Sequence, residues 1–177
     1  MGELQRAVSY YSFENLSFLL VDDNESMRRL VRTILHQLGS HDIVDAPEGA
    51  VALTLLRKQP VDIAVCDMMM RPMDGIAFTR AVRQDAESPN RFLPIIMTSA
   101  YSEPDKVLAA RDAGVTEFLA KPLSVTALYQ RVMSVVERPR PFVRNGAYFG
   151  PLRRGIDAGP SIPRRPASFG TLEMLDG

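Results

Sequence analysis

Short apolar runs alternate with segments of helical period between residues 16 and 137. Five runs rich in branched and aromatic residues follow one another at roughly 25-residue spacing; they are 18–21, 43–44, 61–66, 94–97 and 118–120. Between them, apolar residues recur every three or four positions, as in Met27, Leu30, Val31, Ile34, Leu35 and Leu38. This alternation predicts βαβ units with right-handed crossovers, and therefore a doubly wound α/β fold with a five-stranded parallel sheet.

The expected helices begin and end at residues that favour helix termini. Gly39 follows the first helix in the C-cap region, and Pro60 ends the second. Asp74 and Ser124 stand where they can cap the third and last helices. Residues 102–105 (SEPD) resemble a capping box, which predicts a fourth helix that continues to about residue 113.

The composition changes after Glu137, which divides the chain into three expected parts. Residues 1–15 form a lead-in, 16–137 one α/β domain and 138–177 a tail. The tail holds 6 of the 13 Pro and 6 of the 11 Gly, and it shows no helical or strand period. It is therefore expected to be a tail without a core of its own.

Charge and cysteine usage narrow the class of protein. The formal net charge is zero, but residues 1–137 carry a net −4 and residues 138–177 a net +4. One Cys, Cys66, cannot form an internal disulfide, and we expect it to be a small buried core residue. No apolar run reaches the roughly 20 residues of a membrane helix. These features indicate a cytoplasmic protein without a membrane partner.

Polar side chains follow four of the expected strands. Asp22 and Asp23 follow the first, Asp67 ends the third, Ser99 ends the fourth and Lys121 follows the fifth. In open α/β sheets, ligands bind at the carboxyl ends of the strands. Three crowded carboxylates require a cation, and hard oxygen ligands favour Mg²⁺. With a Lys and a hydroxyl beside them, this set favours phosphoryl transfer onto Asp67.

Five sequence motifs resemble those of receiver domains of two-component response regulators. They occur in the family's order at 19–24 (LLVDDN), 65–67 (VCD), 73–75 (MDG), 95–100 (IIMTSA) and 118–122 (FLAKP). The resemblance covers residues 16–137 and implies the flavodoxin-like or CheY-like strand order 2-1-3-4-5. It implies a signalling switch that a histidine kinase or phosphotransfer protein phosphorylates, not a turnover enzyme.

The resemblance also implies a role for each acidic residue. Asp67 takes the place of the phospho-acceptor. Asp23 resembles the direct Mg²⁺ ligand and Asp22 its water-linked neighbour, and the backbone carbonyl of Met69 would complete the protein ligands.

The remaining matched residues imply the phosphate contact and the switch. Lys121 resembles the phosphate-pairing lysine, and its bond to Pro122 is often cis in the family. Ser99 takes the place of the hydroxyl residue that moves to the phosphoryl group, because Ala100 follows it, so Thr98 is expected to point elsewhere. Phe118 stands at the aromatic rotamer switch. Output is then expected at the face of the fourth helix, fifth strand and last helix, toward a protein partner or a second copy of the chain.

The sequence departs from the family's pattern beside the acceptor. Arg71 stands where the family usually has Pro, and Pro72 follows one position late, which predicts an altered loop. Met69 and Tyr101 occupy the positions that tune dephosphorylation. Both are bulky and neither activates water, so we expect a long-lived phosphoryl group. Phe118 in place of Tyr cannot donate a hydrogen bond, which weakens the preference for the inward rotamer.

Other interpretations stay open at this point. Each polar strand end, taken alone, is also typical of a turn or helix cap. A small Asp-dependent phosphotransferase would need a second Asp two residues after Asp67, where Met69 stands. The Met68–Met70 run is better explained by apolar packing than by a soft metal. The tail mixes Arg with Phe142, Tyr148, Phe149 and Phe169. Three interpretations stay open: docking on the acidic domain or a dimer partner, which we favour, disorder, or binding of nucleic acid.

Overall fold

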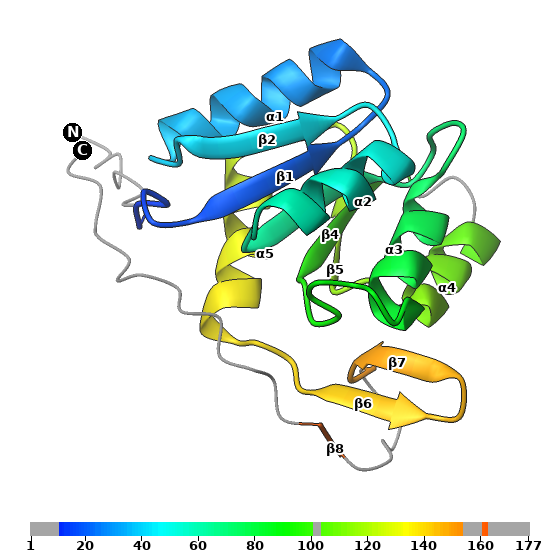
Figure 1. Cartoon of the computed structure of the whole chain (residues 1–177). Helices are drawn as coiled ribbons and strands as arrows, with labels where there is room; N and C mark the ends of the chain where they lie inside the picture. Colours follow the sequence, from blue (N-terminus) through cyan, green and yellow to red (C-terminus); the bar gives the residue numbers. More distant parts are fainter. Residues whose placement is uncertain (1–10, 101–103, 154–160, 163–177) are drawn as a thin grey trace, which may run out of the picture.

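Five parallel strands form the central sheet of the computed structural model, which describes residues 11–100, 104–153 and 161–162. The strands are β1 (Ser17–Val21), β2 (Asp42–Ala46), β3 (Ile63–Asp67), β4 (Ile95–Ser99) and β5 (Glu117–Ala120), in the order β2-β1-β3-β4-β5 (Figure 1). This confirms the predicted fold class and strand order. The two central strands β3 and β4 are buried throughout, as expected for a sheet covered on both faces.

Helices cover both faces of this sheet (Figure 1). They are α1 (Glu25–Gln37), α2 (Gly49–Lys58), α3 (Gly75–Gln84), α4 (Pro104–Ala113) and α5 (Val125–Glu137). One hydrophobic cluster joins α1 and α5 to the sheet, a second joins α2 and α3, and a third packs α4 near β4. Leu30, expected on the apolar face of α1, is exposed, so that face is narrower than the sequence predicts.

Several predicted helix ends are confirmed. Asp74 Oδ1 accepts a hydrogen bond from Ala77 N at 2.8 Å, and Ser124 Oγ accepts one from Ala127 N at 3.1 Å. Gly39 adopts φ 96°, in the left-handed region that favours glycine at a helix C-terminus. The predicted cap at Ser102 lies outside the described residues.

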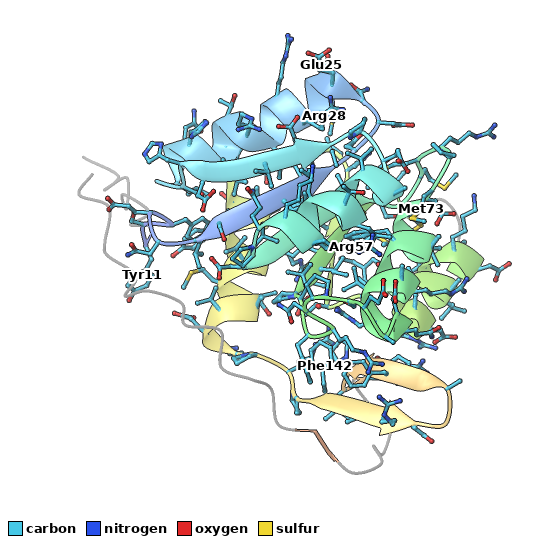
Figure 2. The ribbon with its side chains drawn as sticks, in the orientation of Figure 1. Tyr11, Glu25, Arg28, Arg57, Met73 and Phe142 are labelled. Atoms are coloured by element: carbon cyan, nitrogen blue, oxygen red, sulfur yellow. The ribbon has the colours of Figure 1, made fainter. Side chains whose placement is uncertain are left out.

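The chain continues past α5 into a hairpin, although the sequence there has no helical or strand period. Antiparallel strands β6 (Phe142–Asn145) and β7 (Tyr148–Pro151) pair, and the short β8 (Ser161–Ile162) pairs with β6. The turn begins at Gly146 with φ 57°, and Gly at the first central position is typical of a type II′ turn. Figure 2 shows Phe142 between the hairpin and the body of the domain, where its side chain is buried.

The expected lead-in also contributes to the core. Phe13 is fully buried, stacks on Tyr129 of α5 at 5.6 Å between ring centroids, and donates its backbone N–H to Leu38 O at 2.7 Å. Residues 11–16 therefore close one end of the α1–α5 cluster.

Within the described parts of the chain, none of the helices has the length and apolar character needed to cross a membrane.

Candidate functional site

The carboxyl ends of β1, β3, β4 and β5 meet at one edge of the sheet. β3 lies between β1 and β4, so Asp67, its last residue, stands centrally. Asp22 and Asp23 follow β1, and Lys121 follows β5. The five residues that the sequence places at strand ends are therefore at the same edge. This arrangement is the one that open α/β sheets use to bind ligands.

Three carboxylates converge at this edge. Asp22, Asp23 and Asp67 can each offer an oxygen such that these atoms lie within 4.8 Å of one another. Asp22 and Asp67 are buried and Asp23 is exposed. Burial is the main reason that the pKa of Asp22 is raised above its ordinary value, and the negative charge of Asp67 adds to it, while the Asn24 N–H bond and Lys121 lower it. A hard divalent cation fits this oxygen set, because it would neutralise carboxylates that otherwise repel.

Lys121 supplies the positive charge inside the site. Its Nζ lies 3.0 Å from Asp67 Oδ1 and 4.0 Å from Asp22 Oδ2. The peptide bond between Lys121 and Pro122 is cis, as the family resemblance implies. The lysine backbone N–H also donates to Ser99 O at 2.9 Å, which fixes the start of this loop against β4.

Thr98 places a hydroxyl beside Asp67, which corrects the expectation that Thr98 points elsewhere. Its Oγ1 lies 3.4 Å from Asp67 Oδ1, a long hydrogen bond. The reason is register: Thr98 is the parallel partner of Asp67, while Ser99 pairs with Ala120. Ser99 is buried at the end of β4, next to the same edge.

Phe118 on β5 and Cys66 on β3 belong to strands that end at the site. Phe118 is half-buried and packs against the hydrophobic cluster that contains residues of α4. A change in the rotamer of Phe118 therefore alters a contact of that helix. Cys66 is fully buried, and its burial together with the charges of Asp67, Asp22 and Asp74 raises the pKa of the thiol. A thiol held protonated is a poor nucleophile, in agreement with the expected core role.

The loop that follows Asp67, which contains Arg71 and Pro72, turns back toward the end of β3. The Arg71–Pro72 peptide bond is cis, and the loop returns so closely that a Cβ on Gly75 would lie 2.2 Å from Asp67 O. This loop, Ile76 and Lys106 border a hollow of about 720 Å³.

The run of three methionines divides between the core and the surface. Met68 and Met70 are buried among apolar residues, which confirms the packing interpretation. Met69 is 53% exposed, and its Sδ lies 3.4 Å from Lys106 Nζ on α4.

Sequence reasoning missed two further contacts around the acids. Arg28 on α1, labelled in Figure 2, donates from Nη1 to Asp22 O at 2.7 Å and forms an ion pair with Asp45 on β2 at 3.1 Å. Asn24 N donates to Asp22 Oδ1 at 2.8 Å. An Asp–x–Asn turn signal exists in the sequence for the second contact, but the first depends on how α1 packs on β2.

Comparison with known proteins agrees with this geometry. Residues 18–133 match the family model described as "Response regulator receiver domain". The chain is 33% identical over 125 residues to chemotaxis protein CheY-3 of Vibrio cholerae serotype O1, which covers 71% of this chain and 95% of that protein.

Solved structures agree as well. A response regulator from Chloroflexus aurantiacus superposes with a TM-score of 0.64 at 28% identity over 70% of this chain and 98% of that one. The receiver domain of a sensor histidine kinase from Pseudomonas aeruginosa PAO1, which has magnesium coordinated in its active-site cleft, superposes with a TM-score of 0.60 at 27% identity over 68% and 95%. Together with the convergent Asp67 site, these matches show that the chain belongs to the response regulator receiver domain family, the phosphorylation-dependent switches of two-component signalling.

Proposed function

We propose that Asp67 is the phospho-acceptor and that a histidine kinase or a phosphotransfer protein is the donor. The observation that carries the proposal is the contact between Lys121 Nζ and Asp67 Oδ1 at 3.0 Å, inside a group of three carboxylates. Asp67 is the last residue of the central strand β3 and is 7% exposed, at the carboxyl edge of the sheet.

The transfer needs one bond formed and one broken. Asp67 Oδ attacks phosphorus, the bond from phosphorus to the donor histidine nitrogen breaks, and that nitrogen keeps the electron pair. Lys121 lies where its ammonium group can move from the free carboxylate to a phosphoryl oxygen. Such a fixed charge stabilises the oxygens in the transition state and costs little reorganisation.

Asp22, Asp23 and Asp67 would hold a Mg²⁺ ion, with the Met69 carbonyl as a further ligand. Their grouping within 4.8 Å fits this ion, and the P. aeruginosa relative contains magnesium in its active-site cleft. When bound, Mg²⁺ would supply charge neutralisation for the phosphoryl oxygens. The carboxylates position it, and Asn24 and Arg28 hold Asp22 in place through the contacts at 2.8 and 2.7 Å.

Phosphorylated Asp67 is expected to persist as a signalling state, because the residue two positions after it cannot activate water for hydrolysis. Met69 stands two residues after Asp67, where an Asp-dependent phosphotransferase would carry its second acid, and Met69 is 53% exposed. A thioether does not activate water, so the phosphoryl group is expected to be long-lived.

Ser99, Thr98 and Phe118 are proposed to carry the signal toward α4, β5 and α5. Thr98 contacts Asp67, and Ser99 is the last residue of the same strand, β4. Phe118 on β5 packs against the hydrophobic cluster that contains α4. A phosphoryl group on Asp67 offers new acceptor oxygens to these hydroxyls, which biases an existing equilibrium between two arrangements. The exposed Leu108 on α4 belongs to the face at which a downstream protein or a second copy would bind.

Binding of nucleic acid through the tail aromatic residues is not supported. Phe142 and Phe149 are buried against the receiver, and the half-buried Tyr148 ring has the guanidinium of Arg153 over it at 4.1 Å. These three rings therefore already pack against groups of the protein, which leaves them poorly placed to stack on a base. Phe169 lies outside the described residues.

Intact mass after incubation with acetyl phosphate and Mg²⁺ tests the proposal. The full chain should gain one phosphoryl group, and Asp67→Asn should gain none. Asp62→Asn is a matched control, because Asp62 lies outside the site and bonds Ser17 at 2.8 Å; it should be labelled like the wild type. An unlabelled wild type, under conditions where Mg²⁺ binding is measured separately, would refute the assignment.

A further inference from the structure

The hairpin of β6 and β7 is joined to the receiver by an aromatic cluster of its own. The rings of Phe92, Phe142 and Phe149 lie 5.1 to 5.6 Å apart between centroids. Phe142 is 1% and Phe149 4% exposed, yet neither belongs to the three clusters that form the receiver core. The hairpin is therefore attached to the domain at a separate surface, formed by α3, the segment before β4 and the end of α4.

A buried arginine of α3 ties this surface to the sheet. The side chain of Arg83 is fully buried, and its guanidinium carbon lies 5.0 Å from the centre of the Phe142 ring. Arg83 Nε donates to Gly114 O at 3.0 Å, and Arg83 Nη2 donates to Thr116 Oγ1 at 3.5 Å. The same hydroxyl oxygen accepts from Ile95 N at 3.0 Å, so the contact reaches the first residue of β4.

β7 and the residues directly after it contact the carboxyl end of α4. Arg153 forms an ion pair with Asp112 at 3.1 Å. Gly150 approaches Gly114 so closely that a Cβ on Gly150 would lie 2.9 Å from Gly114 Cα. Only a residue without a side chain permits this approach.

Both elements that the hairpin contacts have their opposite end near the phosphorylation site. β4 begins at Ile95 beside Arg83 and ends with Thr98 and Ser99 beside Asp67. α4 ends beside the hairpin, and Lys106 near its start contacts Met69 of the loop after Asp67 at 3.4 Å. Strands and helices transmit displacement as units because the interior is closely packed. A change at either end of these elements must therefore be accommodated at the other.

We propose that the β6–β7 hairpin is an intramolecular latch that favours the unphosphorylated arrangement of β4 and α4. This inference rests on the proposed role of Asp67. The contacts are those of the domain with Lys121 paired to an unmodified Asp67. A phosphoryl group on Asp67 that shifts β4 or α4 weakens the latch, and by linkage a weakened latch raises the affinity of the site for a phosphoryl group.

The test measures this linkage in both directions on the full chain, with beryllofluoride and Mg²⁺ as the stable phosphoryl analogue. Gly150→Ala adds a Cβ that would lie 2.7 Å from the Tyr148 hydroxyl oxygen and 2.9 Å from Gly114 Cα, so the contact between β7 and the end of α4 must shift. Asn145→Ala is the control, because Asn145 is exposed at the end of β6 and the change leaves the glycine of the turn in place. Gly150→Ala should lower the beryllofluoride concentration for half-saturation by about fivefold or more, the usual lower range of coupling between two sites. Asn145→Ala should leave it unchanged. Arg153→Ala, which removes only the Asp112 pair and the ring contact, should shift it in the same direction by less.

Hydrogen exchange of residues 142–151 supplies the reciprocal readout. In the wild type, saturating beryllofluoride should speed exchange of these amides, while the β1 amides stay protected. If the wild type binds the analogue but the exchange rates and the Gly150→Ala midpoint stay the same, the latch is refuted and the proposed function stands. If the wild type binds no analogue, both are overturned.

Discussion

Replacing Asp22 by Asn should stabilise the metal-free protein, because Asp22 is a buried carboxylate whose charge is not neutralised until a cation binds. Asn has the same shape and keeps the oxygen that accepts the Asn24 N–H at 2.8 Å. The change therefore removes a charge and leaves the turn intact. Three contributions decide the result: attraction to Lys121, repulsion from Asp67, and the cost of burying the charge.

The two Coulomb contributions nearly cancel. At an effective dielectric constant of about 20, Lys121 at 4.0 Å attracts Asp22 by about 4 kcal/mol, and Asp67 within 4.8 Å repels it by about 3 kcal/mol or more. Asp22 is 8% exposed, so the burial cost dominates, which is also why burial leads the causes that raise its pKa. We expect Asp22→Asn to gain about 1 kcal/mol, or about 2–4 °C in Tm for a chain of this size.

Thermal unfolding in EDTA at neutral pH is the assay. Added Mg²⁺ should reverse the order, because a ligand at 100 times its Kd stabilises the wild type by about 2.7 kcal/mol and the variant loses most of that gain. Asp23→Asn is the control: Asp23 is exposed, so its Tm in EDTA should match the wild type while its response to Mg²⁺ falls. A lower Tm of Asp22→Asn in EDTA would refute the reasoning.

The raised pKa of Asp22 also predicts how the stability of the metal-free protein depends on pH. Since the pKa of Asp22 is raised in the folded state, the folded protein binds more protons than the unfolded one at pH values above 3.8, the ordinary value. Stability of the metal-free wild type therefore falls as pH rises through the folded pKa. The advantage of Asp22→Asn should be absent below that range and grow as pH increases.

Two further predictions concern the lysine and the loop beside the acceptor. Lys121→Met should slow phosphorylation of Asp67 by about 100-fold while Mg²⁺ still binds, because the variant lacks one fixed positive group that stabilises the transition state. Rates measured from intact mass against time check this prediction, and an unchanged rate would exclude the role of Lys121. Gly75→Ala should destabilise the protein by about 1–3 kcal/mol in urea unfolding, because its Cβ would lie 2.2 Å from the Asp67 carbonyl oxygen. Gly49→Ala is the matched control: its Cβ would meet the flexible Met73 side chain, so this variant should lose clearly less unfolding free energy.

Most of the receiver could be predicted from the sequence because its signals are local. Each strand from β1 to β5 is an apolar run, and each polar group at a strand end is next to it in the chain. Parallel strands share one carboxyl edge, so the convergence of Asp22, Asp67 and Lys121 follows from topology alone. Asp74 and Ser124 could be assigned as caps for the same reason, since a cap is read within three residues.

What the sequence analysis missed depends on contacts between distant residues. Thr98 was expected to point elsewhere, but strand register places it opposite Asp67, and a shift of one residue exchanges the two faces of a strand. Phe142 and Phe149 have no periodic neighbours, so their burial against Phe92 could not be inferred from a pattern. The burial of Arg83 depends on carbonyls about 8 and 31 positions away.

Phe13 bears on how a recombinant fragment of this protein should be cut. The family match begins at residue 18 and ends at residue 133, yet Phe13 stacks on Tyr129, and the hairpin rings cover Arg83. A fragment trimmed to the family limits would uncover an aromatic face at one end and a guanidinium at the other, and both favour aggregation or fraying. Boundaries before residue 11 and after residue 153 keep both anchors, and measurements on anything shorter would describe a different molecule.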